Sequence, residues 1–595
     1  MACVFALAVS ALAVLPLAAR SEEKVLRYAF QVAETSFDPA EISDLYSIYV
    51  VAAIFDAPLT FDYLARPFKV RPNLLEAMPD ISPDGKTYLL HFKRGIYFQD
   101  DPVFKGVKRE MTAADYVYGL KRIFDPVNKC PNKYLWDGYI VGMDALEKKA
   151  VQTGHFDYDA PLAGMELVDR YTLRIHLAQP NYNLLYYMTD ARFGVMAREV
   201  VEFYGKEIGA HPVGTGPFRL GSWRRSSKIV LERNPTYREE YWDAEPPADD
   251  PQAQEIARRL KGRRLPMLDR VEIYIVEEPQ PRWLAFLNEE HDFIERLPNE
   301  FINQAAPGGK LNANLARRGV QSNRVAGIEV NYSYFAMENP VVGGYTPEKV
   351  ALRRAMALGY NVDEEIRIPR KNQAIVAESP IGPGAAGYDP DFHSNATDHD
   401  PARARALLDM YGYIDRDGDG YRETPDGKPL VIEYASAPDQ ERRYLAELWK
   451  KDMDAIGIHM EFKFAKWPDL LKESKAGRLM MWGLGWTTTT PDADSFFVML
   501  YGPNAGQANH SRFRLAEFDE LYRRAKALPD GPERNAIYRD MNRLFLAYAP
   551  WRLSVHRIYT HLCHAWVVGC SVNPVLNSHW KYVDIDLDVL RRRKQ

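Results

Sequence analysis

LVIEYASAPDQERRYLAELWKKDMDAIGIHMEFKF, residues 430–464, decides the fold of this chain. Its pattern predicts a strand over 430–436, a helix over 439–456 that stops at Gly457, and a second strand along which Ile458, Met460, Phe462 and Phe464 alternate with polar residues. A strand, a helix and a strand in this order form a crossover, which makes the two strands parallel. Short strand patterns alternate with helical ones along the rest of the chain, so the sequence predicts an α/β fold.

A hydroxyl-rich loop follows the next predicted strand, which covers residues 480–486. The loop lies within LGWTTTTPDADSFF, residues 484–497, and has no helical period. In sheets with parallel strands, ligands bind beyond the carboxyl ends of the strands. We therefore expect the loop to lie where a ligand binds. A solvated loop is the alternative, because threonine is common at strand ends.

Length and composition bound the class of protein. The 595 residues are 46% hydrophobic and 12% aromatic, a globular composition at a length where one core normally divides into several domains. The formal net charge is -5, whereas a nucleic-acid or anionic-membrane partner would favour a basic face. We therefore expect neither of these partners.

The N-terminus has the pattern of a secretory signal peptide, which we place at residues 1–19. Phe5–Ala19 is an apolar run that is too short to span a membrane, and polar residues follow it. Met1–Cys3 carries no Lys or Arg, so the alternatives are a true start that lies upstream and a buried helix. Since no later run reaches spanning length, the sequence predicts an exported, periplasmic protein.

Motifs of catalysis are missing from the sequence. It contains no G-x-S-x-G elbow, no H-E-x-x-H, no P-loop and no G-x-G-x-x-G after a strand. His561, Cys563, His564 and Cys570 suggest a soft metal site, but on a strand His564 points away from the face that His561 and Cys563 share. We predict no metal and no cofactor. Cys563 and Cys570 could pair across a tight turn, although we favour free buried thiols.

An acidic loop resembles the first half of a calcium-binding loop. Asp415, Asp417 and Asp419 occupy loop positions one, three and five, and Gly420 occupies position six. Position twelve is Asp426 instead of the usual Glu, and Asp-Gly pairs are ordinary turn residues. We favour a surface turn and leave calcium binding open.

Eight motifs follow one another along the chain: FDPAEISDLYSIYVVAAIFDAPLTFD, GTGPFRLGSW, LERNPTYR, LRRAMALGYNVDEEI, GYIDRDGDGYRE, GWTTTTPDADSFF, YGPNAGQANHSRF and FDELY. Their order resembles that of the extracellular solute-binding proteins of peptide-type transporters, family 5, the oligopeptide-, dipeptide- and nickel-binding group. The resemblance covers essentially the whole mature chain. It implies a two-lobed periplasmic binding protein fold of type II, in the large three-domain cluster with mixed sheets.

The resemblance also implies a division into domains. Domain I is a discontinuous lobe made of residues 24–62, 205–327 and 556–595; domain II is inserted at 63–204; domain III, residues 328–555, is the opposing lobe. In such a protein the ligand is trapped when the lobes close around a hinge, and an inner-membrane ABC permease then receives it. A monomer suffices for this capture.

The chain departs from the family within the threonine loop. In peptide-binding relatives an acidic residue in this segment holds the ammonium group of the peptide, and Thr489 takes its place here. A hydroxyl does not neutralise a buried ammonium, and an unpaired buried charge is costly. Either Asp492 or Asp494 replaces the missing acid, or the threonines bind a ligand that is not an ordinary free-amine peptide.

We predict a periplasmic protein that captures a peptide or peptide-like solute and is not an enzyme. The expected ligand contacts are Trp486, Thr487, Thr488 and Thr489, with Asp492 and Asp494; Ser43, Asp44, Tyr46 and Ser47 in an N-terminal loop that faces the cleft in relatives; and Asn509 and Arg512. The alternatives are a binder of a non-peptide solute, such as a metal chelate or haem, and a periplasmic hydrolase.

Overall fold

The computed structural model describes residues 22–488 and 490–594. The predicted signal peptide and Thr489 therefore lie outside the described residues. Among the described helices, none combines the length and the apolar character that crossing a membrane requires.

The crossover predicted at residues 430–464 is present in a five-stranded mixed sheet with the order β16-β15-β17-β13-β18. β15 (Val431–Ser436) pairs in parallel with β16 (His459–Phe464), and α13 (Gln440–Asp454) connects them. Asp439 caps the helix by accepting a 3.0 Å hydrogen bond from the Arg442 backbone, and Gly457 has the left-handed φ of 75° that ends it. This prediction is confirmed.

Three further strands complete this sheet. β17 (Met481–Thr487) lies parallel to β15 and antiparallel to β13 (Glu329–Phe335), which pairs on its other side with β18 (Trp551–Leu553). The register of β13 and β17 sets Glu329 opposite Thr487 and Val330 opposite Trp486. The carboxyl end of β17 and the start of β13 therefore meet at one edge of the sheet.

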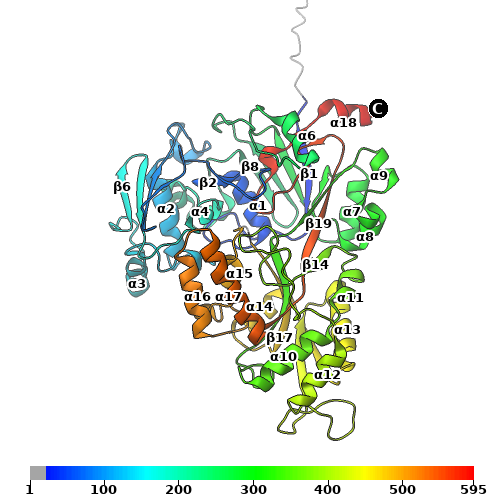
Figure 1. Ribbon diagram of the computed structural model, residues 1–595. Helices are drawn as coiled ribbons and strands as arrows, with labels where there is room; N and C mark the ends of the chain where they lie inside the picture. Colours follow the sequence, from blue (N-terminus) through cyan, green and yellow to red (C-terminus); the bar gives the residue numbers. More distant parts are fainter. Residues whose placement is uncertain (1–21, 489, 595) are drawn as a thin grey trace, which may run out of the picture.

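Two sheets form the part of the molecule that holds both described ends of the chain (Figure 1). The first has the order β1-β10-β9-β8. Its strands are β1 (Val25–Phe30), β8 (Phe218–Arg224), β9 (Lys228–Arg233) and β10 (Arg270–Ile275). The second has the order β11-β19-β12, and β14 also pairs with β19. Its strands are β11 (Phe293–Ile294), β12 (Gln321–Ala326), β14 (Ala374–Val376) and β19 (Val555–Cys563).

β19 connects two parts of the molecule. Figure 1 shows it running from the part that holds β17 and α10 (Pro347–Gly359) to the part that holds β1 and α6 (Pro251–Leu260). It follows β18 after a single residue, Ser554, so one continuous segment leaves the five-stranded sheet and enters another. Residues of both parts are brought together along this strand.

A third part of the molecule is built on the sheet β4-β5-β7-β6. Its strands are β4 (Asp80–Ile81), β5 (Thr87–His91), β6 (Met165–Asp169) and β7 (Thr172–His176). Its helices include α2 (Ala113–Phe124), α3 (Met143–Thr153), α4 (Leu184–Tyr187) and α5 (Arg198–Tyr204). Figure 1 shows this part, in blue and cyan, beside the other two.

The remaining longer helices cover the other sheets. They are α1 (Leu45–Ile54), α7 (Pro279–Leu287), α8 (Asn299–Ala305), α12 (Pro401–Met410), α14 (Trp467–Lys475), α16 (Ala516–Lys526), α17 (Pro532–Tyr548) and α18 (Leu587–Lys594). A short helix, α15 (Asp494–Phe497), follows the threonine loop.

Separate hydrophobic clusters hold these parts together. One contains buried side chains from Leu59 to Val213. A second combines residues near both described ends with the segment around β8–β10. Two more lie on the five-stranded sheet, and one of these also takes in Phe61 and Val575 from outside it. The parts are therefore packed against one another.

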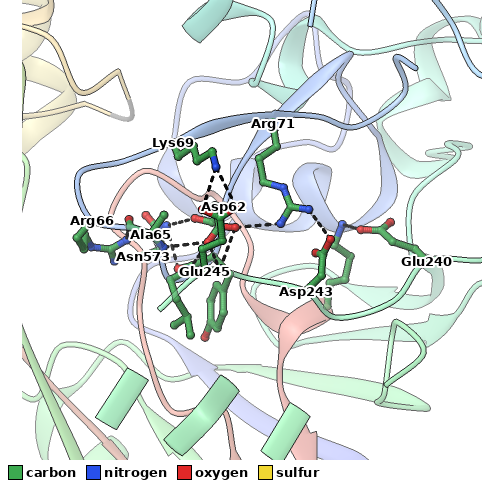
Figure 2. Close-up of polar contacts among 12 residues, drawn as sticks. Asp62, Ala65, Arg66, Lys69, Arg71, Glu240, Asp243, Glu245 and Asn573 are labelled. Atoms are coloured by element: carbon green, nitrogen blue, oxygen red, sulfur yellow. Dashed lines mark hydrogen bonds and ion pairs between the residues drawn. The ribbon is translucent and has the colours of Figure 1, made fainter. Parts of the chain in front are cut away.

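Asp62 fixes the point where several segments cross (Figure 2). Its carboxylate accepts hydrogen bonds from the backbone of Ala65 at 2.9 Å and of Glu245 at 3.1 Å, and it pairs with Arg71 at 2.9 Å. The Asn573 amide donates to the Asp62 carbonyl at 2.9 Å. Chain segments far apart in the sequence are thus held by the carboxylate and the carbonyl of one buried residue, Asp62.

The structure corrects one expectation about the cysteines. Cys563 and Cys570 form a disulfide with their Cα atoms 6.1 Å apart, so the expectation of free thiols is wrong. β19 ends at Cys563, and the chain turns through β20 (Val567–Val568), which returns Cys570 to the end of β19. Among the described residues, Cys130 is the free cysteine.

Candidate functional site

The predicted threonine loop begins where β17 meets the start of β13. Trp486 is half-buried and packs against the hydrophobic cluster of this sheet. Thr487 is exposed, and its hydroxyl donates to the Glu329 carboxylate at 3.3 Å. The Thr488 backbone donates to the Ile328 carbonyl at 3.1 Å. Three of the four residues that we rank first therefore lie together at this edge; the fourth, Thr489, lies outside the described residues.

Glu329 is the acid that the Thr487 hydroxyl contacts, and it is fully buried. Arg557 holds it with two hydrogen bonds, from Nε at 2.5 Å and from Nη2 at 2.7 Å. Asn331 donates to it at 2.9 Å, and the Tyr559 hydroxyl also contacts it. Burial raises the pKa of a carboxyl, but these partners, Arg557 above all, outweigh burial and lower the pKa of Glu329 to about 2. Glu329 is therefore a paired carboxylate.

A second arginine, Arg296, also contacts the Tyr559 ring. Arg296 follows β11, has a left-handed φ of 54°, and places its guanidinium 4.3 Å from the centre of the Tyr559 ring. The Arg557 guanidinium lies 5.4 Å from the centre of the same ring. Backbone strain of this kind in a residue other than glycine persists where surrounding contacts enforce it. One tyrosine thus contacts two guanidinium groups.

Glu295 is the acidic neighbour of Arg296. It accepts a 2.9 Å hydrogen bond from the Tyr49 hydroxyl and contacts the Tyr28 hydroxyl, and its carboxylate lies 3.6 Å from the Arg296 Nε. Burial raises the pKa of Glu295 to about 7, although the charge of Arg296 opposes the rise. The carboxyl therefore titrates near neutral pH.

Helix α1 contributes one aromatic side chain beside this group. Tyr46 and Ser47 lie in the first turn of this helix, so their expected place in a loop is wrong. Tyr46 is half-buried, and burial raises its pKa to about 12 while the nearby Arg296 opposes the shift. Ser43 is exposed. Asp44 caps α1 by accepting from the Ser47 backbone at 2.8 Å and also binds Thr35, and the buried Ser47 hydroxyl accepts from the Thr35 backbone at 2.9 Å. Asp44 and Ser47 thus have partners within the protein.

Asp492 and Asp494 are buried and bind protein groups. Asp492 accepts from Arg534 at 2.9 Å and from Tyr538 at 2.7 Å, and burial raises its pKa to about 6 although Arg534 opposes this. Asp494 accepts from Asn183 at 3.0 Å, in the segment that precedes α4. Neither carboxylate has more than 4% of its side chain exposed, so neither is available to a ligand ammonium in this structure.

Asn509 and Arg512 lie away from the threonine loop. The Asn509 amide donates to the Phe513 carbonyl at 2.8 Å, and Arg512 donates to the Lys475 carbonyl at 2.7 Å. The Met337 backbone binds the Ser511 carbonyl, which sets this segment at the far end of β13 from Glu329. A strand of this length separates the two ends by about 20 Å. The structure does not bring these two residues to the site.

Sequence reasoning missed Glu329, Arg557, Tyr559, Arg296 and Glu295. The sequence offered one indication of the Glu329–Arg557 pair, namely opposite charges next to the two expected domain crossings. Glu329 and Arg557 stand one residue after the first position expected for domain III and for the last segment of domain I, and they carry opposite charges. Their pairing joins residues 228 positions apart, so no local pattern reveals it.

The acidic loop brings four carboxylates together. Ligand atoms of Asp415, Asp417, Asp419 and Glu423 lie within 4.8 Å of one another. Asp426, which we expected at position twelve, instead binds Lys428 at 2.7 Å. Three of the four side chains are exposed, as is common for acidic turns. Calcium binding stays open.

Comparison with known proteins gives the family. The model of the bacterial extracellular solute-binding proteins, family 5 Middle, matches residues 69–508, which is more than half of the chain. The chain is 24% identical over 589 residues to di/tripeptide-binding protein 2 of Pseudomonas aeruginosa, covering 96% of each chain. It is 23% identical over 606 residues to the dipeptide-binding protein of Escherichia coli, covering 97% of each.

A solved structure has the same fold. It is an ABC transporter-associated periplasmic binding protein of Helicobacter pylori in complex with peptide STSA. The TM-score is 0.74 at 21% identity, and the match covers 95% of this chain and 99% of the other. The expected two-lobed α/β fold with mixed sheets is confirmed.

Proposed function

The chain belongs to the bacterial extracellular solute-binding proteins of family 5, and from this premise we propose that it captures a peptide or peptide-like solute in the periplasm and delivers it to an inner-membrane ABC permease. The observation that carries the proposal is the meeting of β17, β13 and β19, where half-exposed polar and aromatic groups from several parts of the chain surround one edge of a sheet. Peptide-binding relatives that match nearly the whole chain support the choice of solute.

We propose domains I, II and III at the boundaries expected from the sequence, namely 24–62 with 205–327 and 556–595, then 63–204, then 328–555. The separate hydrophobic clusters support this division. The ligand would lie between domains I and III, and the crossings at Gly327–Ile328 and Val555–His556 would act as the hinge. Ligand contact with both lobes would favour the closed form, which is the form that a permease recognises.

The proposed ligand contacts are Trp486, Thr487 and Thr488 from one lobe and Tyr46 and Ser43 from the other. Trp486 would pack against the ligand, and the threonine hydroxyls would bind its polar groups. We do not include Asp492, Asp494, Ser47, Asn509 or Arg512, because their side chains bind protein groups or lie elsewhere. Asp44 would act through its cap on α1.

The proposal assigns no bond chemistry to the chain. The sequence carries none of the nucleophile or metalloprotease motifs sought, and the relatives are binding proteins. An exported monomer is the simplest form that performs capture by closure. Haem or metal-chelate binding is the less supported alternative, since two relatives that match nearly the whole chain are a di/tripeptide-binding protein and a dipeptide-binding protein.

Titration of ligand-free protein tests this function. The protein is unfolded, dialysed and refolded to remove any carried ligand, then titrated with a mixture of di- and tripeptides while X-ray scattering and peptide composition are followed. We expect saturable binding, a smaller radius of gyration and unchanged peptides. Hydrolysed peptides, or no saturable response to any peptide, would contradict the proposal. Trp486→Phe should weaken binding, whereas Trp467→Phe, on α14, serves as the control.

A further inference from the structure

Two ion pairs border the threonine loop, and both turn the same charge outward. In the first, 31% of the Arg557 side chain is exposed but none of the Glu329 side chain. In the second, 22% of the Arg296 side chain is exposed against 7% of Glu295. A ligand that reaches this surface therefore meets guanidinium groups, because the carboxylates lie behind them.

Tyr559 holds the two guanidiniums near each other. Arg296 lies 4.3 Å and Arg557 5.4 Å from the centre of its ring. Contact with an aromatic face favours a guanidinium without neutralising its charge. Glu329 occupies the edge of Arg557 formed by Nε and Nη2, so the second edge, formed by Nη1 and Nη2, is oriented before any ligand arrives. Two N–H groups of such an edge match the paired oxygens of a carboxylate or a phosphoryl group.

Among the described residues, Arg296 has no acidic partner at hydrogen-bond distance. Its backbone donates to His561 at 3.3 Å, and the Tyr49 hydroxyl is a hydrogen-bond partner of its side chain. The closest approach to an acid is the 3.6 Å contact with Glu295, which is longer than a good charged hydrogen bond. Burial raises the pKa of that carboxyl to about 7, so the charge that faces Arg296 is incomplete at neutral pH.

The threonine residues at this edge add polar groups but no charge. The exposed Thr487 hydroxyl donates to the buried Glu329 carboxylate, and Thr488 is half-buried next to it. The two aspartates of this segment, Asp492 and Asp494, are buried and paired elsewhere. A ligand ammonium would meet two outward guanidiniums here, whereas an anion would meet complementary charge.

We propose that Arg296 and Arg557, with Thr487, form a subsite for an anionic oxygen group of the solute, a carboxylate or a phosphoryl group. This inference rests on the proposed function and narrows its substrate class to acidic peptides or peptide-like acids. The ammonium of such a ligand, if it has one, points away from β17. Arg296 and Arg557 are specificity-determining residues, because they select the ligand's charge at this end.

Matched peptides test the subsite. Ligand-free protein is titrated by calorimetry with Ala-Asp-Ala, Ala-phosphoserine-Ala and the isostere Ala-Asn-Ala, each with an amidated C-terminus so that the side chain is the only anionic group, and with glutarate and glutaramide as non-peptide probes. One charged hydrogen-bonded pair corresponds to a preference of roughly tenfold or more. We expect at least that preference for one acidic tripeptide over Ala-Asn-Ala. The stronger of the two acidic arms tells carboxylate from phosphoryl.

Arg296→Asn removes one guanidinium while keeping a residue that tolerates a left-handed φ. We expect the preference for the acidic tripeptide to fall about tenfold and the affinity for Ala-Asn-Ala to stay unchanged. Arg258→Asn is the matched control, because Arg258 lies exposed on α6 and pairs with Glu255 on the same helix. It should leave both affinities unchanged.

The outcomes separate the subsite from the proposed function. Equal or tighter binding of Ala-Asn-Ala, or a preference that Arg296→Asn does not change, overturns the subsite and leaves peptide capture intact. Binding of glutarate but not glutaramide, lost in Arg296→Asn, with no tripeptide bound, upholds the subsite and refutes peptide capture. Binding of none of the five probes overturns both.

Discussion

The stability of the folded protein should depend on pH through one side chain, Glu295. Tyr28, Tyr49 and Arg296 surround its carboxyl, and burial raises its pKa from the usual 4.5 to about 7. A raised pKa means that the folded state holds the proton more tightly than the unfolded state. The resulting stabilisation is therefore complete below pH 4.5 and is lost as the pH rises through 7.

The prediction is a difference between native protein and Glu295→Gln. The native protein should lose roughly 3 kcal/mol of stability relative to the variant between pH 4.5 and pH 8, since each unit of pKa shift corresponds to about 1.4 kcal/mol. Urea unfolding of both proteins across this range measures the difference. A difference that is constant with pH would show that the carboxyl titrates normally.

We predict that substitutions of Glu329 and Arg557 have strongly non-additive effects on the free energy of unfolding. Arg557→Gln leaves a fully buried carboxylate without its main partner, which costs about 3–5 kcal/mol of unfolding free energy. Glu329→Gln combined with Arg557→Gln should cost less than Arg557→Gln alone, because no buried charge is left. The urea unfolding midpoints of Glu329→Gln, Arg557→Gln and the double variant test this. Additive losses would place the pair in a solvated environment.

At the scale of single residues, the sequence indicated where the candidate site lies but not which residues complete it. Trp486, Thr487 and Thr488 follow a predicted strand, so their place at its carboxyl end could be predicted. Asp492 and Asp494 are equally polar in sequence, but their burial depends on Arg534 and Asn183 from distant segments. Glu329 and Arg557 were missed for the same reason, since their contact is tertiary.

The segment formed by β19 and β20 carries the disulfide between Cys563 and Cys570. Closing a loop of this length stabilises a chain by about 2–3 kcal/mol through the entropy of the unfolded state. Replacing both cysteines by serine should lower stability by that amount, whereas Cys130→Ser should have a smaller effect because Cys130 is unpaired. Thermal unfolding with and without reductant provides the comparison. Equal losses for the two variants would contradict a structural disulfide.

Elements with a strong local period could be predicted well. The crossover of β15, α13 and β16 agrees with its expected limits to within a few residues, because an apolar repeat, a capping Asp439 and a terminating Gly457 all indicate it. The disulfide could not be predicted in this way. Two cysteines seven residues apart pair only if the intervening turn returns the chain, and the sequence does not specify that turn.

Contacts between the proposed domains II and III tie the whole molecule in the form described here. The Asn183 amide donates to Asp494 at 3.0 Å, and its oxygen accepts from Arg534 at 2.9 Å. Asn183 lies before α4, whereas Arg534 lies on α17. These bonds exist only while the two parts are together, so they favour the form described here, in which the parts are in contact.

Asn183→Ala should therefore shift the molecule toward open forms. Charged hydrogen bonds of this kind correspond to roughly tenfold in an equilibrium constant. We expect a larger radius of gyration in the absence of ligand and about tenfold weaker solute binding. Asn128→Ala is the control, because the Asn128 amide binds the Arg122 carbonyl within one part of the molecule. Identical scattering from both variants would exclude a role in closure.

The overall architecture could be anticipated because motifs from the whole chain occur in the order of one family, and the match over residues 69–508 agrees with that resemblance. The solute could not be anticipated in the same way. Our proposal assigns its recognition to a few side chains, such as Arg296 and Arg557, which approach each other only after segments far apart in the sequence have packed around Tyr559.

Capture of a solute without bond chemistry is tested most directly by native mass spectrometry of the protein purified from its own cells. We predict one non-covalent ligand per chain, released intact on denaturation and identified by sequencing as a peptide or peptide-like acid. No bound mass under any growth condition, or a ligand that is consumed on incubation with the protein, would contradict capture.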